Sequence, residues 1–158
     1  MSLHLPDETA YRAHYTVNYT RAPVTFRLPT GTAPVYFSAD RFDHAFFESS
    51  KRNGEKDEFS TVRAQRMDDI AIALGDPSIE RRAGWLKHEK CYDHVSCVTL
   101  AVDDFVVIIR LGLNQRGFLK GRFITCYVAD NSINKIRNAP LWDQATCVQA
   151  LSKTRART

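Results

Sequence analysis

The side chains best suited to moving protons and holding phosphate lie mostly in the second half of this 158-residue chain. RNA cleavage without a metal needs such groups. The ribose 2′-hydroxyl attacks its own phosphate, so the protein has only to supply a base, an acid and cations for the charged phosphorane. The residues whose types and positions fit the catalytic roles are His44, Lys87, His88, Thr125 and Tyr127. We therefore expect a catalytic site built from these side chains, with no cofactor.

Cations that could hold an RNA backbone cluster around the same region. Residues 105–138 contain six basic residues and one acidic residue, which gives this segment a net charge of +5 within a chain of net charge +4. The predicted RNA-binding residues are Arg63, Arg66, Lys90, Arg110, Lys120 and Arg122. A solvated Lys and Arg surface, or aliphatic stems that cover the core edge, would explain the same residues.

Metal chemistry fits the sequence poorly. Two-metal phosphoryl transfer needs several convergent carboxylates, and the acidic residues here are scattered. His88, Cys91, His94 and Cys97 recur every three residues, but they straddle two predicted strands and a turn and lack the usual paired spacing of zinc ligands. We therefore expect no metal, and we expect the four cysteines to be free thiols in a reducing compartment.

A predicted antiparallel sheet positions most of these residues. Its strands are expected at residues 85–90, 95–102, 105–113 and 121–129. Asp103 and Asp104 form one tight link, and residues 114–117 form another, which predicts a meander.

Alternation along the last strand predicts which of its side chains share a face. It places Phe123, Thr125 and Tyr127 on one face and Arg122, Ile124 and Cys126 on the other. Two helices on one face of the sheet would leave the other face open to a substrate.

Helical periodicity is found on both sides of that sheet. Residues 40–50 and 60–74 predict two helices, with Ser38 and Ser60 as N-caps, and Pro140 is expected to begin a short helix that ends at Leu151. Residues 14–20 alternate instead between apolar and polar types, as do residues 24–28, which predicts extended structure.

The predicted fold class is therefore α+β. We expect an N-terminal extended, accessory segment at residues 1–38, one nuclease-like domain at 39–151 and a basic tail at 152–158. The first residues lack the charged and apolar regions of a signal peptide, and no apolar run is long enough to span a membrane. Action in the cytoplasm is the corresponding expectation.

Residues 63–130 resemble the barnase–EndoU–colicin D–RelE (BECR) nuclease superfamily, particularly its phage- and toxin-associated branches. The resemblance rests on a helix that starts near Arg63, the segment 75–79, the charged strand 85–90, the apolar run 105–109 and the segment 121–127. It implies a metal-independent endonuclease that attacks RNA of the tRNA or mRNA class.

The resemblance also implies where the active site lies. It places Lys87, His88, Thr125 and Tyr127 at polar active-site positions, with His44 as an addition from the preceding helix. A toxin or delivered effector of this kind would have a neutralising immunity or antitoxin protein as its partner.

Two other functions remain open. A non-catalytic nucleic-acid or protein-binding module, of phage or bacterial origin, would use the same basic sheet and would bind in a salt-sensitive way without turnover. An ADP-ribosyltransferase-like toxin would use Arg, His and Tyr to hold a dinucleotide. This second alternative ranks last because no Glu is well placed to activate a nucleophile.

Overall fold

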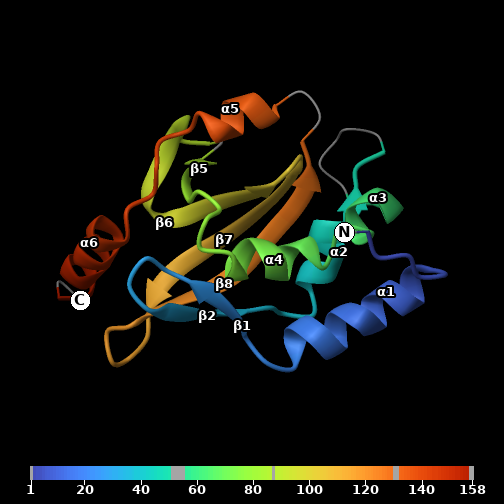
Figure 1. The fold of residues 1–158 in the computed structure, drawn as a ribbon, viewed down its shortest axis with the longest axis horizontal. Coiled ribbons are helices and arrows are strands. Elements are labelled where there is room, and N and C mark those ends of the chain that lie inside the picture. The colour runs from blue at the N-terminus through green and yellow to red at the C-terminus, as the bar shows by residue number, and fades with distance from the viewer. Residues whose placement is uncertain (1, 51–55, 87, 130–131, 157–158) are drawn as a thin grey trace.

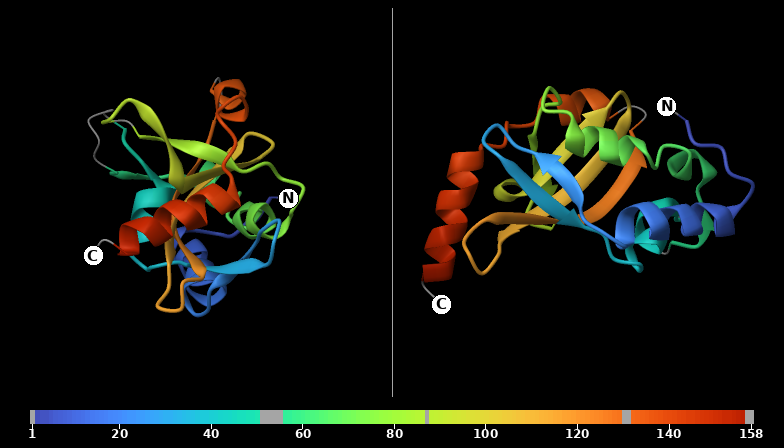
Figure 2. Two further views of the ribbon diagram at one scale, coloured as in Figure 1. Left: turned by 90° about the vertical axis from the view of Figure 1, so that its left-hand side faces the viewer. Right: turned by 60° about the horizontal axis from the view of Figure 1, so that its bottom comes forward.

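The computed structural model describes residues 2–50, 56–86, 88–129 and 132–156, and it confirms the α+β class. A six-stranded mixed sheet runs through the molecule, with helices packed against it (Figure 1). A separate two-stranded ladder joins β3 (Phe47–Glu48) to β4 (Glu58–Phe59). Figure 2 shows α6 at one end of the molecule and α1 at the other, with the chain ends similarly far apart.

The strands of the main sheet lie in the order β1-β2-β8-β7-β6-β5. They are β1 (Val24–Arg27), β2 (Thr32–Tyr36), β5 (Arg82–Leu86), β6 (Cys91–Val102), β7 (Phe105–Leu113) and β8 (Leu119–Val128). The expected antiparallel meander is confirmed in β5 to β8. The expected total of four strands is wrong, because the β1–β2 hairpin extends the sheet through a parallel pairing of β2 with β8.

The helices differ more from expectation. They are α1 (Glu8–Tyr15), a π-helix η1 (Thr16–Thr20), α2 (Arg41–Phe46), α3 (Thr61–Ala64), α4 (Asp69–Gly75), α5 (Ile133–Arg137) and α6 (Gln144–Ala156). Ser60 caps α3 as predicted by accepting a hydrogen bond from the Arg63 amide. The single helix expected at 60–74 is instead two helices, because the intervening turn is closed by tighter backbone bonds such as Met67 N–H to the Ala64 carbonyl.

Residues 14–20, expected to be extended, are helical. Tyr11, Tyr15 and Tyr19 recur every four residues, and this spacing places all three on one buried face of a helix. The apparent two-residue alternation arose from Val17, which is exposed. Asp7 supplies the N-cap by accepting a hydrogen bond from the Ala10 amide.

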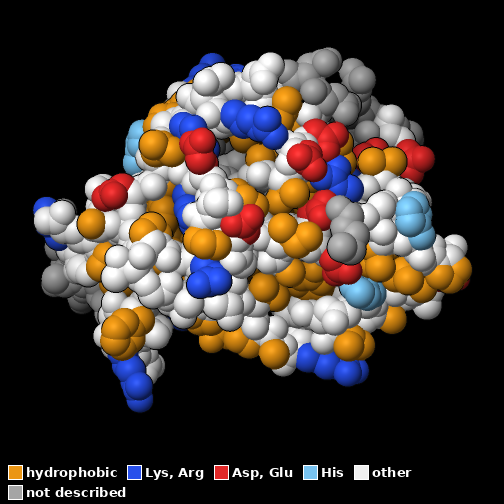
Figure 3. All heavy atoms as spheres, in the orientation of Figure 1, with side chains coloured by type: hydrophobic (Ala, Val, Ile, Leu, Met, Phe, Trp, Pro, Cys, Tyr) orange, Lys and Arg blue, Asp and Glu red, His pale blue; other side chains and the backbone are white. Residues whose placement is uncertain are grey.

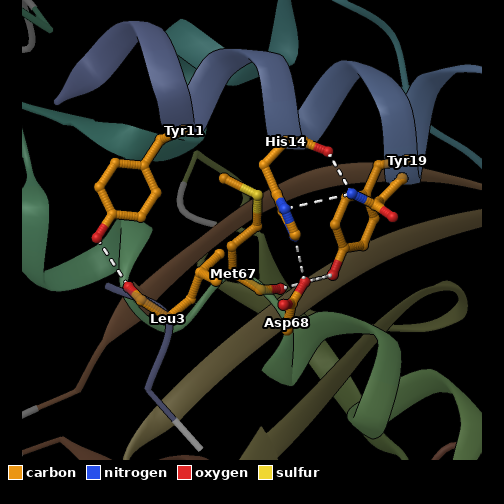
Figure 4. A network of polar contacts seen from close by, with 7 residues as sticks. Leu3, Tyr11, His14, Tyr19, Met67 and Asp68 are labelled. Carbon is orange, nitrogen blue, oxygen red and sulfur yellow. Dashed lines mark hydrogen bonds and ion pairs between the residues drawn. The ribbon is translucent and has the colours of Figure 1, made fainter. Parts of the chain in front are cut away.

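A polar network fastens this N-terminal helix to the turn before α4 (Figure 4). The Asp68 carboxylate lies 2.9 Å from Nε2 of His14 and accepts a hydrogen bond of 2.9 Å from the Tyr19 hydroxyl. Tyr19 is also 3.0 Å from the Met67 carbonyl, and burial beside Asp68 raises the pKa of its phenol. At the other end of α1, the Tyr11 hydroxyl donates to the Leu3 carbonyl.

The C-terminal helix starts later than Pro140. The Pro140 carbonyl accepts a hydrogen bond from Ala83, and Leu141 pairs with Arg82 as an isolated bridge, so this segment is extended along β5. Asp143 then caps α6 by accepting from the Thr146 amide. The helix packs against β6 and β7.

One core holds these elements together. It contains aromatic and aliphatic side chains from β1, β2, β7 and β8 and from the covering helices, including Phe26, Val35, Phe46, Ile70 and Phe123. Figure 1 shows α4 lying in front of the sheet. On the same side of the molecule, acidic and basic side chains are intermingled, so that face presents no patch of a single sign (Figure 3).

Candidate nucleic-acid interface

A β-bulge decides which side chains share a face of β8. Ile109 is opposite Phe123, whereas the preceding residue Ile108 is opposite Thr125, so Ile124 is the extra residue. Arg41 donates a hydrogen bond of 3.3 Å to the carbonyl of this bulged residue.

The bulge corrects the predicted alternation. Arg122 lies on the same side of the sheet as Thr125 and Tyr127, not on the opposite side, while Phe123 and Cys126 both face the core. We call the side of β7 and β8 that carries Arg110, Lys120, Arg122, Thr125 and Tyr127 the open face.

Two arginines sit side by side on the open face. Arg110 and Arg122 are directly opposed partners in the β7–β8 ladder, and both are exposed. Side chains at such positions have Cβ atoms ~5 Å apart, and like charges there destabilise a sheet. Within the described part of the chain, neither guanidinium has a hydrogen bond or an ion pair.

Asp93 lies close enough to Arg110 for that charge to act on it, but its carboxylate makes its hydrogen bonds elsewhere. Asp93 directs its carboxylate to Ser96 and Val95. Burial tends to raise the pKa of Asp93, but these hydrogen bonds, helped by the charge of Arg110, hold it below its ordinary value. The arginine pair therefore keeps both positive charges available to an external anion.

Hollows lie on both sides of Arg122. One of about 670 Å³ is lined by Tyr36, Arg110, Leu111, Gly112, Asn114, Lys120, Gly121 and Arg122. A second, of about 320 Å³, lies where β2 leaves β8 and is lined by Tyr36, Phe37, Ser38, Asp40, Arg41, Arg122 and Phe123. Tyr36 and Arg122 border both hollows, and Tyr36 is 52% exposed. An extended polyanion on this path would pass four cations, Arg41, Arg110, Lys120 and Arg122, and one carboxylate, Asp40.

Other arginines have partners inside the protein. Those whose guanidinium groups donate to described acceptors are Arg12, Arg41, Arg63, Arg66, Arg81, Arg82 and Arg137. Arg63 binds the carbonyls of Ala45 and Phe47 and pairs with Glu48. Arg63 and Arg66, both predicted to bind RNA, are thus engaged in holding the fold.

The predicted catalytic residues do not all meet. His44 lies on α2, whose apolar side chains enter the core, and burial together with nearby Arg41, Lys56 and Arg63 lowers its imidazole pKa. His88 and the predicted RNA-binding Lys90 lie in the exposed turn between β5 and β6, and Lys90 has a positive φ of 52°. Lys87 lies outside the described residues.

Thr125 and Tyr127 are the predicted catalytic residues that lie on the open face. Both are half-buried, and Tyr127 points toward a hollow beneath α5. Burial raises the pKa of the Tyr127 phenol, so this hydroxyl keeps its proton at neutral pH. Thr125 and Tyr127 thus lie on the same face of the sheet as Arg110, Lys120 and Arg122, whereas His44 lies on α2, which packs against β8.

Sequence reasoning missed Tyr36 and Arg41. Both come from the segment expected to be accessory or to start a helix, and both reach the site only because β2 pairs in parallel with β8. Parallel pairing joins segments far apart in the chain, and no local pattern announces it. A signal for Tyr36 was its alternation with the buried residues Val35 and Phe37.

All four cysteines of the chain are free thiols. Cys97, Cys126 and Cys147 are buried free thiols and Cys91 is an exposed one. In the part of the chain that the structure describes, no three His, Cys, Asp or Glu side chains gather as metal ligands would. Among these same residues, no helix has both the length and the apolar character that a membrane crossing requires.

Comparisons of the chain with protein-family models, with curated proteins and with solved structures found no match.

Proposed function

We propose that this protein binds single-stranded RNA along its open face. The observation that carries the proposal is the Arg110–Arg122 pair, which sets two positive charges opposite each other with no hydrogen bond or ion pair to either guanidinium among the described residues. A phosphate between the two guanidinium groups would relieve their repulsion and would accept hydrogen bonds from both. Lys120 extends the cationic row along β8.

Exposed rings favour a single strand over a duplex. Tyr36 borders the arginine pair, and Trp85 and Tyr92 stand further along the same sheet. Unpaired bases stack on such rings with little dependence on sequence, whereas the bases of a duplex are already stacked. The charged row would therefore hold the backbone while the rings receive bases.

Binding is tested by fluorescence anisotropy with a labelled single-stranded RNA. Arg122→Gln is expected to weaken binding roughly tenfold to a hundredfold, because hydrogen bonds that involve charged groups contribute about 1.5–3 kcal/mol. Arg110→Gln should have a similar effect. The matched control is Arg21→Gln, which removes the same charge from an exposed position that borders neither hollow.

Equal loss of affinity in the Arg21→Gln control and in Arg122→Gln would show that only net charge matters, and the proposed site would then be wrong. A DNA strand of the same sequence and a duplex RNA serve as competitors. Stronger competition by either of them would contradict single-stranded RNA as the ligand.

Metal-independent cleavage of the bound RNA is the second candidate function. The observation that favours it is the meeting of two arginines and a phenol at one hollow. In the proposed step the 2′-oxygen attacks phosphorus and its proton passes to water. The bond from phosphorus to the 5′-oxygen then breaks, this oxygen takes a proton from Tyr36, and the resulting phenolate takes a proton back from the protonated water. Arg110 and Arg122 would stabilise the charged phosphorane, and Thr125 and Tyr127 stay predicted participants.

Cleavage is tested by incubating end-labelled RNA with the protein in EDTA. The expected products end in a 2′,3′-cyclic phosphate and a 5′-hydroxyl. Tyr36→Phe should slow their formation more than it weakens binding, because it removes the proton donor but keeps the ring. RNA that stays intact with a saturating amount of RNA-binding protein would contradict the proposed cleavage, and the binding function would be unaffected.

A further inference from the structure

A third hollow lies further along the open face, beneath α5. It has a volume of about 420 Å³ and is lined by Ala83, Trp85, Tyr92, Thr99, Ile108, Tyr127, Ser132, Lys135, Ile136 and Ala139. Its size is in the range of pockets that bury small organic ligands. The RNA-binding function proposed above does not by itself require this pocket.

Aromatic and aliphatic side chains form most of the pocket wall. The rings of Trp85 and Tyr92 meet edge to face with their centroids 5.0 Å apart, and Ile108 adds a flat aliphatic surface. Trp85 is 50% exposed, so part of its indole surface is accessible to a ligand. A planar ring inserted here would cover the indole.

The polar groups that line the pocket are mainly hydroxyl groups. Hydroxyl groups come from Thr99, Tyr127 and Ser132, and hydroxyls both donate and accept hydrogen bonds. Thr99 is 6% exposed, and no hydrogen bond of its hydroxyl is made within the described residues. This combination of apolar walls and hydroxyls suits a heterocycle with donors and acceptors on its edge.

A cation stands at the rim of the pocket. The ammonium of Lys135 lies 5.8 Å from the centre of the Trp85 ring, above its face. An incoming ring would displace this ammonium from the indole face, and the ammonium could then pair with the phosphate attached to that ring. A neutral apolar ligand would offer the displaced lysine no such partner.

The distance of the pocket from the arginine pair indicates which ligand would fit it. Ile108, in the pocket, and Arg110, in the arginine pair, are two residues apart on β7 and face the same way. Two residues of a strand span ~6.8 Å, and successive nucleotides of an extended single strand are similarly spaced. A base in the pocket can thus belong to the strand whose phosphate lies at Arg110 and Arg122.

We propose that the hollow formed by Trp85, Ile108 and Tyr127 beneath α5 is a nucleobase pocket, which takes one base of the RNA strand held by the arginine pair. The proposal rests on the proposed RNA-binding function and gives it a specific subsite. Thr99 and Ser132 would contact the base edge, and Lys135 would contact the adjoining phosphate.

The first test uses a mononucleotide, so that it does not depend on strand binding. Adenosine monophosphate and uridine monophosphate are titrated while tryptophan fluorescence is recorded. Trp142 is buried and donates its indole N–H to the Val95 carbonyl, so the exposed Trp85 should give the response. We expect saturable quenching by the nucleotides, its loss in Trp85→Phe, and none with ribose 5-phosphate.

Pocket variants establish where the ring binds. Ile108→Phe fills the hollow and is expected to weaken nucleotide binding roughly fivefold to a hundredfold, which corresponds to the loss of one stacked base. The matched control is Val62→Phe, which makes an apolar enlargement at an exposed position on α3. Undiminished binding by folded Ile108→Phe, or equal quenching by ribose 5-phosphate, would overturn the proposal.

Photochemical cross-linking decides the question even if Ile108→Phe does not fold. RNA that contains 5-iodouridine is irradiated with the unaltered protein, and the tryptic peptides are analysed by mass spectrometry. The expected cross-links fall in residues 83–87, which carry Trp85, and in residues 91–110, which carry Tyr92. Cross-links confined to other peptides would contradict the pocket.

The two proposals fail in different ways. RNA binding that depends on Arg122, without any response of Trp85 to RNA or mononucleotide, would remove the pocket and keep the RNA-binding function. Quenching by mononucleotides without RNA binding would remove the RNA-binding function and leave the hollow as a mononucleotide site.

Discussion

Arg66 and Arg122 have the same side chain in opposite surroundings. Arg66 contacts Asp69 at 2.6 Å and Asp104 at 2.7 Å, donates to the Val102 carbonyl and lies over the ring of Phe105. Arg122 faces another arginine across the ladder. The contacts of each arginine therefore distinguish a side chain that holds the fold from one that is available to a ligand. The sequence shows the charges but not these contacts, so Arg66 and Arg122 received the same prediction.

Replacing Arg66 with Met should separate stability from binding. The Asp69 side chain is 1% exposed, and the substitution would remove the charged partner of this buried carboxylate. Removal of one partner from a buried ion pair is expected to cost about 3 kcal/mol in the free energy of unfolding, measured with urea. RNA affinity per folded molecule should not change. Arg122→Met should show the opposite pattern, with stability altered by less than about 0.5 kcal/mol.

Elements near the site were partly predictable. The strand β7 matches its predicted bounds, and its turn to β8 contains Gly117 at a positive φ of 83°, as the turn chemistry indicated. The bulge at Ile124 was not predictable, because one extra residue reverses the alternation without changing composition. The predicted site therefore contained Thr125 and Tyr127 but assigned Arg122 to the wrong face.

The strands β5 and β6 pack closely against each other at Gly84. A Cβ added at Gly84 would lie 2.0 Å from the Cys97 sulfur, and Cys97 is the cross-strand neighbour of Arg110. Gly84→Ala should therefore destabilise the sheet by about 1–3 kcal/mol, as overpacking does elsewhere. Gly112→Ala is the control, because nothing lies within 4 Å of its added Cβ. Equal melting temperatures for the two variants would contradict this packing.

The whole molecule depends on its first 38 residues more than their sequence indicated. This segment was expected to be an accessory layer, yet Phe26 and Val35 are fully buried in the common core. Its last residues also bring Tyr36 to the arginine pair. The alternation of β1 and β2 was readable from sequence, but their place in the sheet was not, because that place depends on a partner more than 80 residues away.

A fragment of residues 39–158 should consequently fail to fold alone. It would lose β1, β2 and α1 and would expose core residues of β8 and α4, such as Phe123 and Ile70. Circular dichroism and thermal melting are expected to show no cooperative transition for the fragment. Adding residues 1–38 as a separate peptide should restore part of the transition. A fragment with a melting curve like that of the full chain would show that the N-terminal segment is dispensable.

Salt dependence tests how the charge of the whole molecule is used. A net charge of +4 attracts any polyanion weakly, but only cations in contact with phosphates release counterions from the strand. The phosphate held between Arg110 and Arg122 and a second one at Lys120 together contribute about −1.4 to the slope in a plot of the logarithm of the association constant against the logarithm of salt concentration, since each neutralised phosphate on a single strand contributes about −0.7. Lys120→Gln should reduce the magnitude of the slope by about 0.7, whereas Arg21→Gln should leave it unchanged. A similar change of slope in both variants would mean that RNA is held by diffuse charge. A slope near zero in the unaltered protein would mean that the protein does not contact phosphates at all.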